Sequence, residues 1–77
     1  MNIEEQVILC AAETYEVDQA TITIDTDIRN ELSNQSLLMI AFISNIEEVL
    51  GAVIDLRDAA KLLTIGDFVA KVKEILG

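Results

Sequence analysis

The chain has 77 residues, of which 52% are hydrophobic, and a formal net charge of −9 at neutral pH. This length suits one small domain, which we expect to span residues 1–77, and the hydrophobic fraction excludes a disordered chain. The negative charge excludes binding to nucleic acid and to anionic lipid, and it favours partners with basic surfaces. The longest apolar run, residues 37–43, is far shorter than the ~20 residues of a membrane span, so we expect no membrane insertion.

The first helix is predicted over residues 3–15, where apolar side chains recur at helical spacing. Asn2 can cap its N-terminus, and Glu4 and Glu5 suit the positive end of its dipole. The apolar stripe consists of Ile3, Val7, Cys10, Ala11 and Tyr15. Because Cys10 is the single cysteine and lies on this stripe, we interpret it as core filler in a cytoplasmic protein.

Residues 17–35 predict a long ordered loop that is rich in Thr, Asp and Asn. The TITI stretch at residues 21–24 has strand propensity, but no second strand is predicted with which it could pair. Loops of this length are uncommon in small domains and often carry function. Asp25, Asp27 and Glu31 are spaced loosely like oxygen ligands, but the EF-hand pattern is absent, so we expect no dedicated calcium site.

The second helix is predicted over residues 36–50, with Gly51 as its end. At about 100° per residue, one face gathers the side chains expected in the core, which are Met39, Phe42, Ile43, Ile46 and Leu50. The opposite face consists of Leu37, Ala41, Ser44 and Glu48.

Two further helices are predicted, a short one within residues 57–61 and a last one that begins after Thr64. Thr64 and Asp67 have the spacing of a capping box. The stripe expected to be buried consists of Ile65, Phe68, Val69, Val72 and Leu76. The chain therefore predicts an all-α fold of three main helices and one short helix, with a long loop after the first.

The residue types present restrict the chemistry that the chain can perform. It has no histidine and one cysteine, which excludes Ser-His and Cys-His nucleophile pairs and the usual zinc sites. Its carboxylates are expected on solvated helix faces, and short helices offer little room for a catalytic cleft. A small enzyme is therefore the least favoured hypothesis.

Ser36 is the one candidate for chemistry, and residues alone leave two interpretations. A serine that opens a helix is commonly an N-cap. The same position offers free N–H groups and a positive dipole end, which favour a phosphate ester. The side chain also follows a long loop and lies in a stretch, residues 32–46, that carries no charge.

The stretch NQSLLMIAFISNIEEVLGAVID resembles the carrier motif and second helix of acyl carrier proteins. In that family the serine of an Asp-Ser-Leu motif receives 4′-phosphopantetheine, and the motif here reads Gln35-Ser36-Leu37. The opening IEEQV, Leu32 and the closing LTIGDFVAKV match the family's layout without a gap, so the resemblance covers essentially the whole chain.

The resemblance implies that a holo-carrier synthase, or phosphopantetheinyl transferase, moves the arm from coenzyme A onto Ser36. The arm's thiol then holds an acyl group as a thioester. The protein delivers this group to acyl-loading and acyl-processing enzymes, can shelter it between its helices, and performs no catalysis itself. We expect a monomer.

The departures from the family pattern concern the residues expected to bind partners. Gln35 replaces the motif's Asp, and Leu38 and Ala41 replace acids of the second helix, where only Glu47 and Glu48 remain. These changes favour a specialised carrier, for polyketides, lipid modification or another secondary pathway, over the housekeeping carrier of fatty acid biosynthesis. The expected partner-binding residues are Gln35, Leu37, Leu38, Ala41, Glu47 and Glu48.

Two alternatives stay open at this stage. Leu37, Leu38 and Ala41 form an exposed apolar patch in one interpretation, while in the other Leu38 tucks into the domain and only Leu37 is exposed. The alternative function is an adaptor that keeps the carrier fold, bears no prosthetic group and acts through protein–protein contacts.

Overall fold

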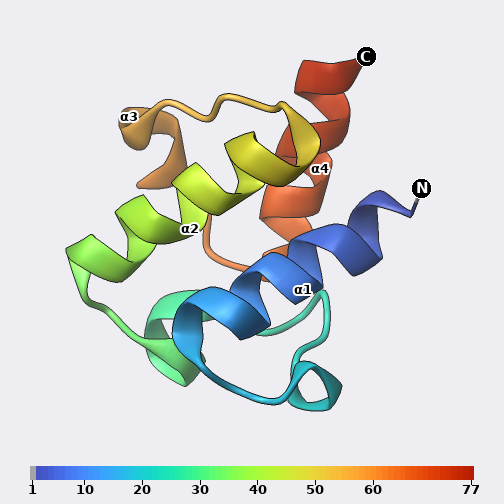
Figure 1. The fold of residues 1–77 in the computed structure, drawn as a ribbon. Helices are drawn as coiled ribbons and strands as arrows, with labels where there is room; N and C mark the ends of the chain where they lie inside the picture. Colours follow the sequence, from blue (N-terminus) through green and yellow to red (C-terminus); the bar gives the residue numbers. More distant parts are fainter. Residues whose placement is uncertain (1) are drawn as a thin grey trace.

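Four α-helices and two short helical turns form the chain in a computed structural model that describes residues 2–77 (Figure 1). In chain order the elements are α1 (Ile3–Tyr15), η1 (Gln19–Thr21), η2 (Ile28–Leu32), α2 (Ser36–Leu50), α3 (Leu56–Ala59) and α4 (Ile65–Leu76). Helices α1 and α2 lie side by side and run in opposite directions, and α4 packs against α1. Residues 2–77 contain no strand, and the predicted all-α fold of three main helices and one short helix is confirmed.

Helix α1 has the predicted bounds because both of its ends are stopped by local geometry. The Asn2 side chain accepts a hydrogen bond from the Glu5 N–H at 3.1 Å, as predicted for the cap. At the other end Glu16 adopts a left-handed conformation with φ of 55°. A polar link then ties α1 to α2, because the Thr14 hydroxyl accepts from the Asn45 amide at 2.7 Å.

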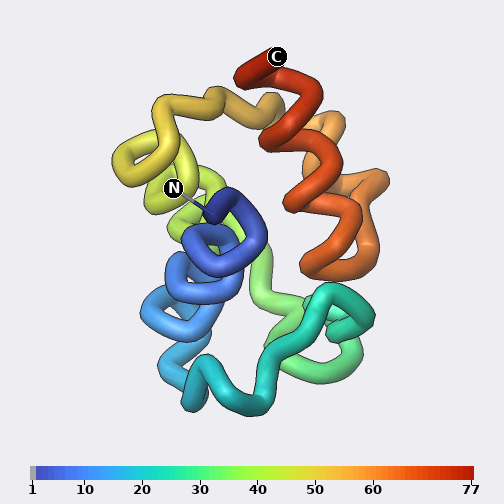
Figure 2. The backbone as a smooth tube through the Cα atoms, turned by 90° about the vertical axis from the view of Figure 1, so that its right-hand side faces the viewer, coloured from blue at the N-terminus to red at the C-terminus, as the bar shows by residue number. Residues whose placement is uncertain are grey.

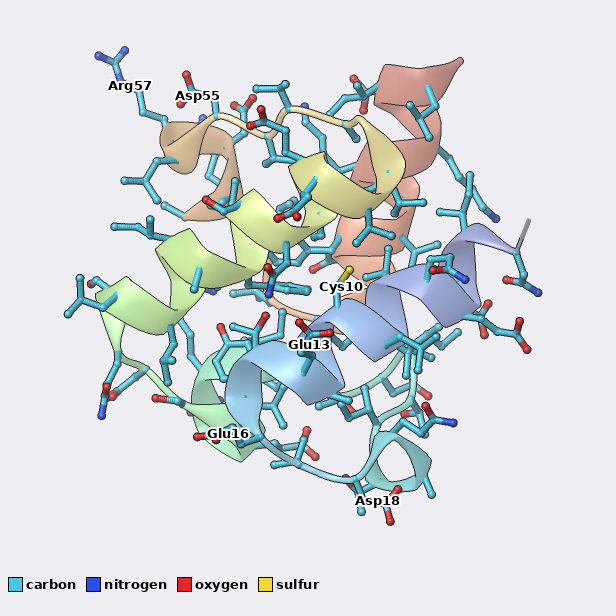
Figure 3. All side chains as sticks on the ribbon, viewed as in Figure 1. Cys10, Glu13, Glu16, Asp18, Asp55 and Arg57 are labelled. Carbon is cyan, nitrogen blue, oxygen red and sulfur yellow. The ribbon has the colours of Figure 1, made fainter. Side chains whose placement is uncertain are left out.

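The core is built from the facing stripes of α1, α2 and α4. Three aromatic rings meet in it: the Tyr15 and Phe42 centroids lie 5.9 Å apart, and those of Phe42 and Phe68 lie 5.0 Å apart. Cys10 is buried in the same core, as predicted, and Figure 3 shows its sulfur on the inner side of α1. Burial, reinforced by the charge of Glu13, raises the pKa of the Cys10 thiol, so it stays protonated and unreactive.

The segment of residues 16–35 closes one end of the bundle between α1 and the start of α4 (Figure 2). The predicted ordered loop contains two helical turns that the sequence pattern did not indicate, η1 and η2, the second being one turn of π-helix. The TITI stretch does not form a strand. Instead, Ile24 and Thr26 each accept one backbone hydrogen bond from the first residues of α4, at 2.8 and 3.0 Å.

Helix α4 begins with the predicted capping box, in which Thr64 and Asp67 satisfy each other's backbone N–H groups. Four members of its predicted stripe are buried, but the expectation for Leu76 is wrong, because its side chain is 47% exposed. The last turn of α4 projects past the other helices, as the top of Figure 1 shows.

Two other predictions need adjustment at their edges. On α2, Met39, Phe42 and Ile46 are buried, whereas Ile43 and Leu50 are only partly buried at the margins of the core face. The short helix is Leu56–Ala59 rather than a turn within residues 57–61, because the Asp55 carboxylate accepts from the Arg57 N–H at 2.7 Å and starts the helix earlier.

Candidate functional site

Ser36 is the first residue of α2, so its interpretation as the N-cap is wrong. Gln35 occupies the cap position in an extended conformation, with φ of −73° and ψ of 126°, and its side chain makes no capping hydrogen bond. The Ser36 side chain is exposed, and within residues 2–77 its hydroxyl has no hydrogen-bond partner. The hydroxyl is therefore free for chemistry instead of being committed to holding the helix.

The N-terminus of α2 is open as well as uncapped. Met39 donates the first hydrogen bond of the helix, to the Gln35 carbonyl at 3.2 Å, and no described group accepts from the N–H groups of residues 36–38. The first turn contains no acid, so no side chain offsets the positive end of the helix dipole. An anion bonded to the Ser36 oxygen would meet both features favourably.

The turn that precedes Ser36 uses a different serine. The Ser33 hydroxyl accepts a hydrogen bond from the Gln35 N–H at 3.1 Å, which fixes the chain as it enters α2. Of these two neighbouring serines, one shapes the turn and the other is left unengaged.

A pocket of about 280 Å³ opens beside Ser36. Residues 33–36 form its polar rim. Its apolar wall comes from α2 and from the short helix and following turn, and consists of Met39, Ile40, Leu56 and Ala60. The free hydroxyl therefore lies at the mouth of a small hollow that can receive an apolar group.

Arg29 completes the lining of the pocket, a position that the sequence analysis did not predict. Its Nη1 donates to the Leu62 carbonyl at 2.6 Å and its Nη2 donates to the Ala59 carbonyl at 3.1 Å. Through these bonds η2 holds the end of α3 in place. The available signal was that Arg29 is the one base in the acidic first 31 residues.

The structure separates the predicted partner-binding residues. Leu37 is 79% exposed and lies on the outer face of α2, where Ala41 and Glu48 are exposed as well. Leu38 is half-buried and packs against the core, so it tucks into the domain and the patch of three residues is wrong, but Ala41 is exposed as well as Leu37. Gln35 and Glu47 are exposed as expected.

Ile40, and not Leu38, is the second large apolar side chain of α2 that is exposed near Ser36. Its side chain is 45% exposed and lines the pocket, between the core face and the outer face of α2. It remains open to solvent there because the helix that it faces, α3, has only four residues.

The acids of the loop have structural roles of their own. The Asp27 carboxylate accepts from the Asn30 N–H at 3.1 Å, and the Glu31 carboxylate accepts from the Asp27 N–H at 2.7 Å. Residues 2–77 contain no cluster of three or more acidic, histidine or cysteine side chains that could hold a metal ion.

Residues 5–72 match the protein family described as the phosphopantetheine attachment site. The match includes the open start of α2 and the pocket beside it, so the chain is of the carrier class that holds 4′-phosphopantetheine covalently.

Two curated relatives narrow this class, and both are named acyl carrier protein. The chain is 36% identical to that of Lactobacillus acidophilus over 66 residues, which cover 86% of this chain and 82% of the relative. It is 32% identical to that of Lactobacillus johnsonii over 62 residues, which cover 80% of this chain and 78% of the relative. The chain therefore belongs to the acyl carrier protein family, as the sequence resemblance implied.

The residues at the start of α2 fit the prosthetic group. A phosphodiester on the Ser36 oxygen would displace no internal hydrogen bond, and the free N–H groups beside it suit its negative charge. The adjacent pocket is lined by apolar side chains that can cover a short acyl chain. None of the helices within residues 2–77 has the length and hydropathy needed to cross a membrane.

Proposed function

We propose that the protein carries acyl intermediates as thioesters on a 4′-phosphopantetheine arm attached to Ser36. The observation that carries this proposal is the free, exposed Ser36 hydroxyl at an open helix N-terminus beside an apolar pocket. Ser33, the nearest alternative, is engaged in its own turn. Family membership supplies the prosthetic group, and the geometry favours this one serine.

Attachment requires little from the carrier except access and charge stabilisation. The Ser36 oxygen forms a bond to the phosphorus of coenzyme A that bears the arm, the pyrophosphate bond breaks, 3′,5′-ADP leaves, and the synthase removes the serine proton. The open N–H groups of α2 stabilise the resulting phosphodiester. The arm supplies a thiol that holds the cargo, and the chain itself provides the pocket and the surface that partners bind.

Mass spectrometry tests the attachment site directly. The apo protein is incubated with coenzyme A and a broad-specificity phosphopantetheinyl transferase, and the intact mass is measured. We expect the gain of one phosphopantetheine, its loss in Ser36→Ala and its persistence in Ser33→Ala and Ser44→Ala. A gain that survives in Ser36→Ala would refute the site, and no gain in the wild type would favour an adaptor without an arm.

We further propose a specialised pathway, such as polyketide synthesis or lipid modification, rather than housekeeping fatty acid synthesis. The reason is the surface around Ser36, where Leu37 and Ile40 are exposed and the first charged residues of α2 are Glu47 and Glu48. Such a surface binds a partner through an apolar contact, while the distant acids provide long-range attraction. We place this monomeric carrier in the cytoplasm, where the buried Cys10 thiol stays reduced.

Salt dependence separates this mode of docking from a purely electrostatic one. Binding to the transferase or another purified partner is measured for Leu37→Ala and Glu48→Gln at two salt concentrations. Truncation of a buried interface leucine commonly costs ~1 kcal/mol or more, and removal of a rim charge costs less. We expect Leu37→Ala to weaken binding more, by a similar factor at both salts. A dominant, salt-sensitive effect of Glu48→Gln would contradict the apolar contact.

A further inference from the structure

Arg29 lines the pocket beside Ser36 as a cation without an acidic partner. The ion pairs found within residues 2–77 join Lys71 to Asp58 and to Glu74, and neither involves Arg29. The acids nearest to it in sequence, Asp27 and Glu31, accept backbone N–H groups of η2 instead. The pocket therefore contains a cation that makes no ion pair within residues 2–77.

The guanidinium is also held in a fixed orientation. Its two terminal nitrogens donate to the carbonyls of Leu62 and Ala59, which restrain the side chain but leave three of its five N–H donors unused. An acceptor that reaches these donors meets a group that is already ordered, so little conformational entropy is lost on binding. The side chain is half-buried, where charge–charge attraction is stronger than in bulk water.

A second polar group without a partner is buried in the domain, although it does not line the pocket. The Tyr15 hydroxyl is buried and has no hydrogen-bond partner within residues 2–77. Burial raises the pKa of this phenol, and the positive charge of Arg29 acts in the opposite direction. Among the residues that line the pocket, Arg29 is the one that carries a charge.

A purely alkyl cargo fits the wall formed by Met39, Ile40 and Leu56 but gives the guanidinium nothing to bind. An alkyl chain that removes water from the guanidinium without providing an acceptor costs desolvation free energy. A charge-assisted hydrogen bond from the cargo offsets this cost. The pocket, at about 280 Å³, also lies near the lower end of the sizes of small-molecule sites, which favours a short chain.

We propose that this pocket selects short acyl cargoes that bear a carboxylate or another strongly accepting oxygen, and that Arg29 binds this oxygen. The proposal rests on attachment of the arm at Ser36. Because the phosphate of the arm is a second possible source of the same chemistry, the experiment must separate the oxygen of the cargo from that of the arm.

The test compares two six-carbon cargoes, hexanoyl and the adipoyl half-thioester, which differ in one terminal carboxylate. Both are loaded on wild-type protein, Arg29→Met and Arg57→Met, and loading is verified by mass. Arg57 is the matched control, because it does not line the pocket and Figure 3 shows it pointing away from the molecule. The readout is the rate at which hydroxylamine cleaves each thioester, since a sheltered thioester reacts more slowly.

We expect Arg29→Met to speed cleavage of the adipoyl thioester roughly tenfold, the value of one hydrogen bond to a charged group, and that of the hexanoyl thioester less than about twofold. Arg57→Met should change neither rate. Each variant is compared with itself across two cargoes, so a general loosening of α3 cancels. If Arg29→Met does not fold, the wild type still decides, because the Arg29 side-chain N–H resonances should shift with adipoyl and not with hexanoyl.

Equal effects of Arg29→Met on both cargoes would overturn the proposal. So would Arg29 resonances that shift fully when the arm alone is attached, because the acceptor would then be the phosphate. These outcomes leave the proposed function intact, since the mass shows the arm on Ser36. An absence of the arm from Ser36 would instead refute the proposed function and this inference together.

Discussion

The N-termini of α2 and α4 are built in opposite ways. At α4 the Thr64 hydroxyl accepts from the Asp67 N–H at 3.1 Å, and the Asp67 carboxylate accepts from the N–H groups of Leu63 and Thr64 at 2.8 and 3.0 Å. The carbonyls of Ile24 and Thr26, in the segment of residues 16–35, accept backbone hydrogen bonds from the same turn. At α2 the cap position is filled by Gln35, whose side chain does not participate, and the first N–H groups have no partner within residues 2–77.

This difference shows which helix start serves the fold and which is available for function. A cap contributes about 1 kcal/mol, which is substantial for a small domain. The uncapped, exposed N-terminus of α2 lacks this stabilisation, and its free N–H groups remain available to a bound group. The following predictions test this contrast.

The largest effect is expected at Gly66 in the first turn of α4. A Cβ atom at this position would lie 2.9 Å from the Ile24 carbonyl oxygen, which is backbone and cannot move aside cheaply. Gly66→Val should lower the free energy of unfolding by about 1–3 kcal/mol, as overpacking does. Urea denaturation checks this, with Ala70→Val on the exposed side of the same helix as the control. Similar losses in both variants would show that the close approach does not matter.

Removal of the cap of α4 should cost less. Thr64→Ala deletes the hydroxyl that accepts from Asp67 and should lower the free energy of unfolding by about 1 kcal/mol. The same denaturation experiment measures it. Attachment of phosphopantetheine in the mass assay should be unchanged, because this helix start lies outside the pocket; impaired attachment would link the two helix starts.

Asp67 makes part of this stability depend on pH. The backbone N–H groups of Thr64 and Leu63 lower the pKa of Asp67 below its usual value of 3.8. Its contribution to folding is therefore complete above that value and is lost as the pH falls through the lower pKa of the folded state. Denaturation midpoints measured from pH 5 to pH 2 should fall less steeply in Asp67→Asn than in the wild type. Parallel slopes would contradict this role.

A cap can be added where the chain lacks one. Gln35 has extended backbone geometry that suits an N-cap, so Gln35→Asp should raise the free energy of unfolding by about 0.5–1 kcal/mol. The same change restores the family's acid before the serine and should speed modification by a synthase of the fatty-acid type. Unfolding curves and the initial rate of modification measure the two effects separately. If neither changes, the interpretation of the α2 N-terminus as uncapped is contradicted.

The smallest effect on folding is expected for Ser36→Ala. The Ser36 hydroxyl makes no hydrogen bond within residues 2–77, so its removal should change the free energy of unfolding by less than about 0.5 kcal/mol. The substitution should nevertheless abolish attachment. A loss as large as that of Thr64→Ala would mean that Ser36 does act as a structural cap.

The sequence predicted the parts of the fold that depend on local periodicity and local hydrogen bonds. The bounds of α1 and the capping box of α4 follow from residues within a few positions of one another, and both are as predicted. Leu76 continues the stripe of α4 by the same periodicity, but burial also needs an opposing surface, which the pattern cannot supply.

The candidate site was predicted only in part for a related reason. Ser36 and Leu37 stand out in the sequence because a motif surrounds them. Arg29 enters the pocket through hydrogen bonds to Ala59 and Leu62, at least 30 positions away, and through one turn of π-helix that has no simple sequence signature. Ile40 rather than Leu38 is exposed because α3 has only four residues. The periodicity of α2 does not reveal the length of a neighbouring helix.

The wall of the pocket formed by α3 is held by few contacts. A helix of four residues is not stable by itself, and this one is fastened by the two Arg29 hydrogen bonds and by the ion pair of Asp58 with Lys71 at 3.5 Å. Leu56 lines the pocket with its side chain 53% exposed, whereas Ala59 at the end of α3 is fully buried in the core. The hollow beside Ser36 is therefore only as rigid as these few polar contacts and this one buried methyl group make it.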